Sequence, residues 1–137
     1  MRIERATDMA EIQRCVPFEQ KIRDKGRDDT KISDMLYSIK FLISNPQFGF
    51  WIAYDDRGEV IGYFSALITI FPGAKRLNLL RIYAKQREVF EAFEKVGGEF
   101  AKEWGVKIIA MIAKGHIKAF RRRHGFKVVS VNMEKEL

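Results

Sequence analysis

The sequence has very little cysteine and histidine, which limits the chemistry that it can support. Cys15 is the only cysteine, so an internal disulfide and a cysteine-rich zinc site are both excluded. The two histidines, His116 and His124, are too few for a histidine-rich centre, and we predict no bound metal. Because Cys15 falls among apolar residues at helical spacing, we expect a buried small side chain and not a nucleophile.

Long apolar runs are also missing. No uninterrupted apolar stretch is long enough to span a bilayer, and the first residues lack the apolar core of a signal peptide. There is no internal repeat, no low-complexity segment and no linker-like stretch. With 137 residues, of which 47% are hydrophobic, the chain can bury a substantial core. We therefore expect one globular domain over residues 1–137, cytoplasmic and not associated with a membrane.

Acidic residues are absent from residues 114–127, KGHIKAFRRRHGFK, although the whole chain contains 18 of them. This segment has six Lys or Arg and both histidines, and the chain carries a net charge of +7. Such a patch suits a polyanion, either nucleic acid or a phosphate-rich cofactor. A solvated helix face is the alternative interpretation.

The hydrophobic periodicity predicts alternating strands and helices. A strand at residues 2–5 precedes a helix that begins with a capping box at Asp8 and Glu11 and that Pro17 should end or kink. Residues 21–29 are polar enough to be an exposed connection. The remaining predicted elements are a helix at 30–44, strands at 50–54, 59–71 and 76–84, a helix at 87–104 closed by Gly105, a strand buried on both faces at 107–113, a helix at 115–124 and a last strand at 126–134.

The predicted order is therefore β-α-α-β-β-β-α-β-α-β. A strand–helix–strand unit between residues 76 and 113 implies a crossover between parallel strands. The fold class that follows is α/β or α+β, with one mixed sheet flanked by helices in a single domain.

The stretch RIYAKQREVF, residues 81–90, joins a strand to a helix through a basic turn. The free N–H groups and the dipole of a first helical turn favour an anion, so this is a candidate phosphate site. The turn contains no glycine, however, and side chains hinder close approach of a phosphate to the backbone.

The element order and three local stretches resemble the GNAT superfamily of acyl-CoA N-acyltransferases. The stretches are the hairpin strand EVIGYFSAL, the helix end FAKEWGVKII and the terminal AFRRRHGFKVVSV, and the resemblance covers nearly the whole chain. It implies a protein that uses acetyl-CoA, with the thioester between the fourth and fifth strands and the pantetheine arm along residues 79–83.

In that family the turn after the fourth strand reads Q/R-x-x-G-x-G/A and holds the pyrophosphate with backbone amides. The matching turn here, residues 83–88, has no glycine, so side chains of Lys85, Gln86 and Arg87 would have to compensate. The cofactor-binding residues that the resemblance implies are Ile82, Tyr83, Lys85, Gln86, Arg87, Glu88, Lys114 and Arg121.

The family's usual proton donor is a tyrosine four residues before the last glycine, a position that Arg121 occupies here. Arginine does not release a proton at working pH but can stabilise a thiolate electrostatically. The titratable candidates for the acid are His116 and Tyr83. No carboxylate in residues 76–84 offers itself as the base that an ammonium acceptor needs.

Three functions are compatible with these observations. The first is a divergent N-acetyltransferase that transfers an acetyl group from acetyl-CoA to a small-molecule or protein amine by direct attack. The second is a catalytically inactive module on the same fold. The third, ranked last, is a nucleic-acid-binding module that uses the basic residues 121–123.

Overall fold

The protein is described by a computed structural model over residues 1–24, 31–71, 74–111, 117–128, 133 and 135–137. The strands of these residues form one five-stranded sheet in the order β1-β2-β3-β4-β5. Neighbouring strands are antiparallel from β1 to β4, and β5 is parallel to β4. The strands are β1 (Arg2–Arg5), β2 (Phe48–Tyr54), β3 (Val60–Phe71), β4 (Ala74–Ala84) and β5 (Ile109–Met111). The predicted fold class is thereby confirmed.

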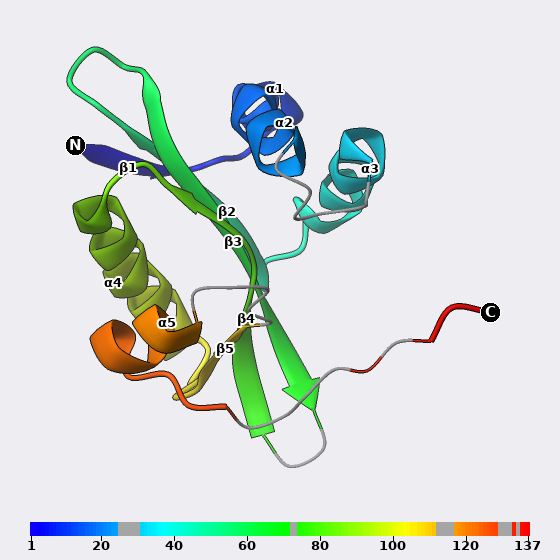
Figure 1. Ribbon diagram of the computed structural model, residues 1–137, viewed down its shortest axis with the longest axis vertical. Coiled ribbons are helices and arrows are strands. Elements are labelled where there is room, and N and C mark those ends of the chain that lie inside the picture. The colour runs from blue at the N-terminus through cyan, green and yellow to red at the C-terminus, as the bar shows by residue number, and fades with distance from the viewer. Residues whose placement is uncertain (25–30, 72–73, 112–116, 129–132, 134) are drawn as a thin grey trace.

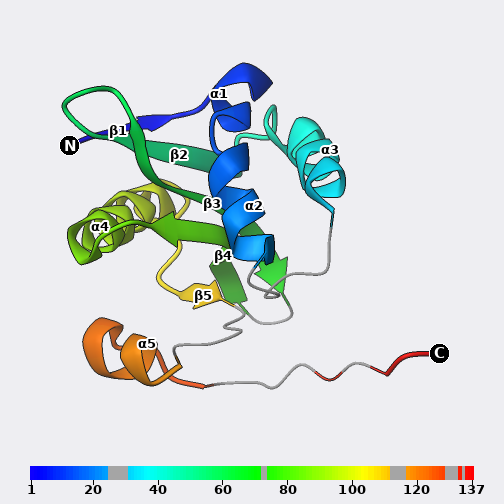
Figure 2. The same ribbon diagram turned by 45° about the horizontal axis from the view of Figure 1, so that its top comes forward.

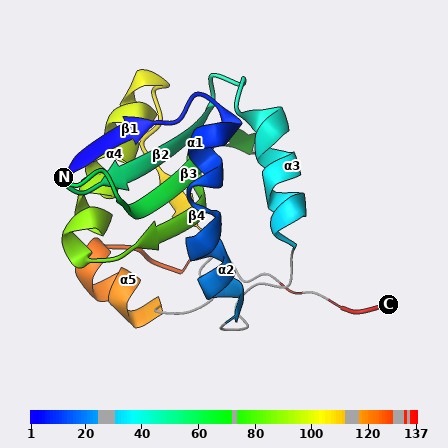
Figure 3. The same ribbon diagram turned by 90° about the horizontal axis from the view of Figure 1, so that it is seen from above.

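Helices cover both faces of the sheet (Figures 1 and 3). On one face lie α1 (Met9–Gln13), α2 (Val16–Asp24) and α3 (Ile32–Leu42). The other face carries α4 (Arg87–Glu103), and α5 (Ile117–His124) lies beyond β5, at the end of the sheet opposite β1 (Figure 2). None of the helices in the described residues combines the length and the apolar character that a membrane span requires.

The sheet separates two hydrophobic cores. The α2-side core contains Phe50, Ile52 and Tyr63 and packs under α1, α2 and α3. The α4-side core contains Phe64 and Phe93 and packs under α4. Because successive strand residues point to opposite faces, β2 supplies both cores and all seven of its residues are buried.

Local signals explain several element boundaries. The Asp8 side chain accepts a hydrogen bond from the Glu11 N–H at 2.9 Å and caps α1, as predicted. Gly105 follows α4 with a φ of 67°, and Gly125 follows α5 with a φ of 69°, so both helices end in the left-handed conformation that glycine favours.

The structure corrects the prediction around Pro17. The first helix ends at Gln13, and Pro17 lies in the first turn of a separate helix, α2, that runs to Asp24. Proline is tolerated there because the first turn lacks intrahelical acceptors for its N–H groups. Residues 21–24, which were predicted to belong to an exposed connection, are therefore helical.

Two predictions at the C-terminal end are corrected for the residues that the structure describes. Residues 107–113 were predicted as a strand buried on both faces, but within the described residues β5 has three residues of intermediate burial and lies at the edge of the sheet, and Ile108 before it is 44% exposed. A last strand was predicted at 126–134, yet 126–128 belong to no strand. Residues 129–132 and 134 lie outside the described part of the chain.

Candidate active site

Strand β4 contains a bulge at Leu80. Ser65 of β3 pairs with Arg81 and the next residue, Ala66, pairs with Leu79, so Leu80 is left out of the register. The bulge consequently shifts the alternation of side chains along β4 by one residue. Leu79 and Ile82 pack in the α4-side core, whereas Tyr83 packs in the α2-side core.

The bulge also marks the point where β5 stops pairing with β4. Within the described residues the two strands pair from Leu77 to Leu79 of β4, and residues 81–84 pair only with β3. On the side away from β3, residues 82–84 therefore have no strand beside them in the described part of the chain, and a bound extended molecule could use their backbone donors and acceptors. The stretch overlaps residues 79–83, along which the resemblance implies the pantetheine arm.

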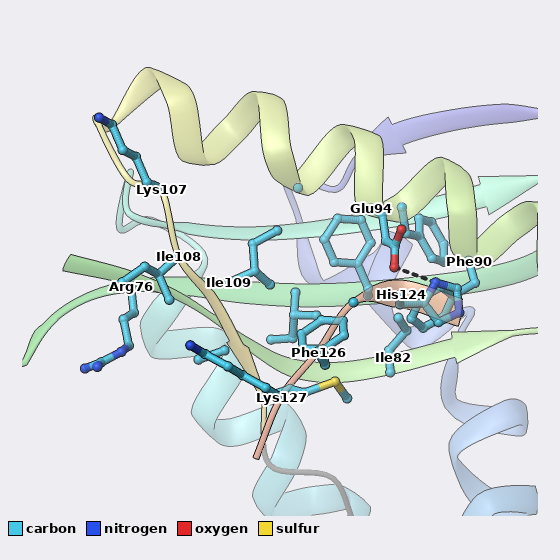
Figure 4. Close-up of a pocket in the computed structure, with 17 residues that line it drawn as sticks. Arg76, Ile82, Phe90, Glu94, Lys107, Ile108, Ile109, His124, Phe126 and Lys127 are labelled. Carbon is cyan, nitrogen blue, oxygen red and sulfur yellow. Dashed lines mark ion pairs between the residues drawn. The ribbon is translucent and has the colours of Figure 1, made fainter. Parts of the chain in front are cut away.

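A pocket of about 790 Å³ lies on the α4 side of this opening (Figure 4). Its volume falls in the range of small-molecule sites. Its walls are mainly apolar and come from β4, α4 and β5, including Leu79, Ile82, Phe90, Phe93, Ile109 and Met111. Arg76, Lys107 and Lys127 lie toward one end of the pocket, and Glu94 and His124 lie toward the other.

The first turn of α4 is open to solvent next to this pocket. Gln86 is the N-cap residue in an extended conformation, with a φ of −140°, and its side chain does not cap the helix. Residues 85–88 are all exposed. The Lys85 N–H is used by the sheet, since it donates to the Ile61 carbonyl at 2.9 Å. The N–H groups of the turn and the dipole favour an anion, although the Glu88 carboxylate opposes one.

A buried carboxylate lies on the opposite face of the sheet. Glu19 of α2 is 1% exposed. Its Oε1 accepts a hydrogen bond from the Tyr63 hydroxyl at 2.9 Å and lies 3.9 Å from Nε of Arg81, the residue after the bulge. Burial raises the pKa of Tyr63 far above its usual value, and the charge and hydrogen bond of Glu19 add to this effect, so Tyr63 stays a donor. The Glu19 cluster, defined as Glu19, Tyr63 and Arg81, thus fastens α2 to β4 at the bulge.

Cys15 behaves as predicted from its apolar surroundings. Its side chain is 1% exposed in the α2-side core. Burial, followed by the negative charge of Glu19, raises the pKa of the thiol from 9.0 to about 12. A thiol that stays protonated is a poor nucleophile, so Cys15 has no part in the candidate site.

Because of this raised pKa, the free energy of unfolding depends on pH in the alkaline range. Since the folded-state pKa exceeds the unfolded value, the stabilisation is complete below pH 9.0 and is lost as the pH rises toward about 12. We expect the free energy of unfolding to fall by about 1.4 kcal/mol per pH unit from this group above its unfolded pKa. Urea denaturation at increasing pH measures the slope. A Cys15→Ala variant should keep only the contribution of tyrosines such as Tyr54 and Tyr63, whose pKa values burial also raises; an unchanged slope would contradict the assignment.

The structure places the predicted site residues in different surroundings. Ile82 lines the pocket, and residues 85–88 form the exposed turn beside it. Tyr83 faces away from the pocket, with its ring centroid 5.2 Å from that of Phe18 and 5.6 Å from that of Tyr63. Arg121 is exposed on α5. Lys114 and His116 lie outside the described residues.

Sequence reasoning did not single out two acidic residues of this region. Glu19 was missed because the polar stretch after it obscured the continuation of a helix. Glu94 was missed because it lies in a charged helix, and only the fold shows that its Oε1 lies 2.7 Å from Nδ1 of His124. The signal that could have identified Glu94 was its position on the apolar side of an amphipathic helix.

Comparisons with known proteins place the chain by its fold. No family model and no curated protein matches the sequence. Among solved structures, a predicted acetyltransferase of Clostridium acetobutylicum with acetyl-CoA matches with a TM-score of 0.79 at 16% identity, over 98% of this chain and 95% of that one. An aminoglycoside 6′-N-acetyltransferase of Acinetobacter haemolyticus matches with a TM-score of 0.77 at 19% identity, over 100% and 99% of the two chains.

At such low identity the likeness concerns the fold. It extends over nearly the full length of both proteins in each comparison, and the shared architecture is a mixed sheet with helices on both faces. The chain therefore shares the fold of these two acetyltransferases, which is the fold that the resemblance to the GNAT superfamily implied.

Proposed function

We propose that the protein is a divergent N-acetyltransferase that transfers an acetyl group from acetyl-CoA to an amine by direct attack. The observation that carries this proposal is the opening between β4 and β5. There, within the described residues, β5 pairs with β4 only as far as Leu79, and the stretch at residues 82–84 lies beside the apolar pocket and next to the exposed first turn of α4. Acetyl-CoA has an extended thioester arm, which suits the backbone of β4 and the apolar pocket. Its phosphorylated end suits the first turn of α4.

In this proposal the pantetheine arm of acetyl-CoA lies along β4 at residues 79–83. The pyrophosphate lies at the turn of residues 85–88, with Lys85 and Arg87 supplying positive charge. Arg87 also pairs with Glu91 at 2.8 Å in the same helix, so its guanidinium would be shared or released on binding. Lys114 and Arg121 remain predicted further contacts. The acetyl-CoA in the structure from Clostridium acetobutylicum supports this choice of donor.

The transfer itself needs a neutral amine that attacks the thioester carbonyl, after which the carbon–sulfur bond breaks and CoA leaves. Much of the acceleration would come from holding the two reactants in position. The acceptor is a small-molecule or protein amine, and the aminoglycoside acetyltransferase among the similar structures makes an amino sugar a reasonable first choice for screening.

Removing the two cations of the turn should weaken donor binding. Calorimetric titration with acetyl-CoA and with CoA is expected to show one saturable site, and a Lys85→Ala/Arg87→Ala variant should bind roughly tenfold or more weakly, because each phosphate contact contributes on the order of 1 kcal/mol. The effect should shrink at high salt, since the contacts are exposed.

A matched control is available within α4. Lys95 and Lys102 are also exposed, so Lys95→Ala/Lys102→Ala removes the same charge. These positions are about 12 Å or more along the helix from the turn, which exceeds the screening length at physiological salt. Equal loss of affinity in both double variants would show that only net charge matters, and the turn would lose its assignment.

The exposed guanidinium groups of Arg121, Arg122 and Arg123 favour nucleic-acid binding as a second candidate function. They project around α5, a helix that contains no acidic residue. Binding of oligonucleotides with a steep salt dependence, together with no binding of CoA, would replace the first proposal by this one.

A further inference from the structure

His124 and Glu94 form a close pair between the last turn of α5 and the second turn of α4. The Nδ1 atom of His124 lies 2.7 Å from Oε1 of Glu94. The imidazole is 10% exposed and packs on Phe90, with 4.3 Å between the ring centroids. These two contacts hold the ring in place. Both partners belong to α4, about thirty residues earlier in the chain.

The pair belongs to the wall of the pocket. Both side chains line it together with Ile82, which follows the bulge on the stretch of β4 that is open toward β5 (Figure 4). His124 also lies three residues after Arg121, so the two start from the same side of α5. Arg121 holds the position at which the resemblance implies a proton donor, and His124 is a titratable group one turn further along.

The geometry determines what the imidazole can do. A carboxylate at Nδ1 orients the ring and favours the tautomer with its proton on that nitrogen, which leaves Nε2 as the nitrogen that can exchange a proton with a ligand. The other charged groups near the pair are the arginines 121 and 123 on α5 itself, Glu91 on α4, and the pocket cations Arg76, Lys107 and Lys127. Figure 4 shows these last three away from the imidazole, so Glu94 is the charged group nearest to it.

We propose that His124, oriented by Glu94, is the proton donor to the departing CoA sulfur. This inference rests on the proposed acetyl transfer. The amine nitrogen bonds to the acetyl carbon, the carbon–sulfur bond breaks, and the sulfur takes the proton from Nε2 of the imidazolium. The amine gives up its own proton to water, and His124 regains one from solvent, so charge and protons balance. Glu94 acts as a positioning residue.

The product complex with CoA itself provides the test, because it requires no acceptor. If Nε2 of the protonated His124 meets the CoA sulfur, it stabilises the thiolate, and the thiol of bound CoA should ionise at a pH lower by about one unit or more than that of free CoA. Thiolate absorbance, followed against pH at saturating CoA, measures this shift. In His124→Gln the shift should vanish while CoA still binds, and in Glu94→Gln it should be smaller than in the wild type.

The outcomes separate the two proposals. Lys118→Gln changes an exposed cation on the same helix and should retain the full shift. CoA that binds to the wild type with an unshifted thiol would overturn the role of His124 and leave the acetyl transfer standing. No binding of CoA would overturn both. In amine mixtures in which the wild type releases thiol from acetyl-CoA, His124→Gln should be slower by about a hundredfold or more, with unchanged donor affinity.

Discussion

Replacing Glu19 with alanine is expected to lower the free energy of unfolding by about 3 kcal/mol, because removing one partner of a buried charged cluster leaves the other partners unsatisfied. The Tyr63 hydroxyl would lose its acceptor inside the α2-side core, and a cavity would replace the carboxylate. The Arg81 side chain is 26% exposed and can turn to water, which keeps the cost at the lower end of the range for buried pairs. Urea denaturation near neutral pH measures the change.

Two milder variants test whether the cluster is the cause. Glu19→Gln keeps the volume and an oxygen that accepts from Tyr63, so it should cost clearly less than alanine. Tyr63→Phe removes only the hydroxyl, at a cost of about 1.5 kcal/mol for a hydrogen bond to a charged acceptor. If Glu19→Ala proved no more destabilising than Tyr63→Phe, the carboxylate would not hold the cluster together.

The Glu19 cluster also shows how much of the fold can be read from the sequence. The strands at 2–5, 50–54, 59–71 and 76–84 were predictable, because apolar alternation and turn residues act locally. The α1–α2 boundary was not, since whether Pro17 ends a helix or begins one depends on the packing of the residues beyond it. The burial of β5 depends on a neighbouring strand, which no local pattern can supply.

In the candidate site, too, some features were predictable from the sequence and others were not. The turn of residues 85–88 was predictable, because a strand that leads into a helix has a defined chemistry at the junction. The pair of Glu94 and His124 was not, since two side chains thirty positions apart meet only through the packing of α5 on α4. The bulge at Leu80 was equally hidden, although it decides that Ile82 faces the pocket and Tyr83 the opposite core.

Gly62 and Gly98 should respond in opposite directions to the same substitution. A Cβ on Gly62 would lie 2.7 Å from Cγ1 of Val89 and 2.8 Å from the Tyr83 carbonyl oxygen, which belongs to the neighbouring strand and cannot move cheaply. We expect Gly62→Ala to destabilise the protein by about 2 kcal/mol through overpacking. A Cβ on Gly98, inside α4, would meet nothing within 4 Å. Gly98→Ala should therefore stabilise by about 0.5–1 kcal/mol, the difference between the two residues in a helix.

The same pair of variants connects the fold to the proposed function. Gly62 pairs with Ala84 at the end of β4, and a Cβ on it would lie 2.7 Å from Cγ1 of Val89 in the first turn of α4, so a side chain there pushes on both ends of the turn at residues 85–88. We expect Gly62→Ala to weaken acetyl-CoA binding at temperatures where the variant is still folded, and Gly98→Ala to leave it unchanged. Calorimetry under the same conditions compares them. If Gly62→Ala lowered the stability but not the affinity, the donor phosphates would have to bind away from this turn, because the substitution acts on the turn's two anchoring points directly.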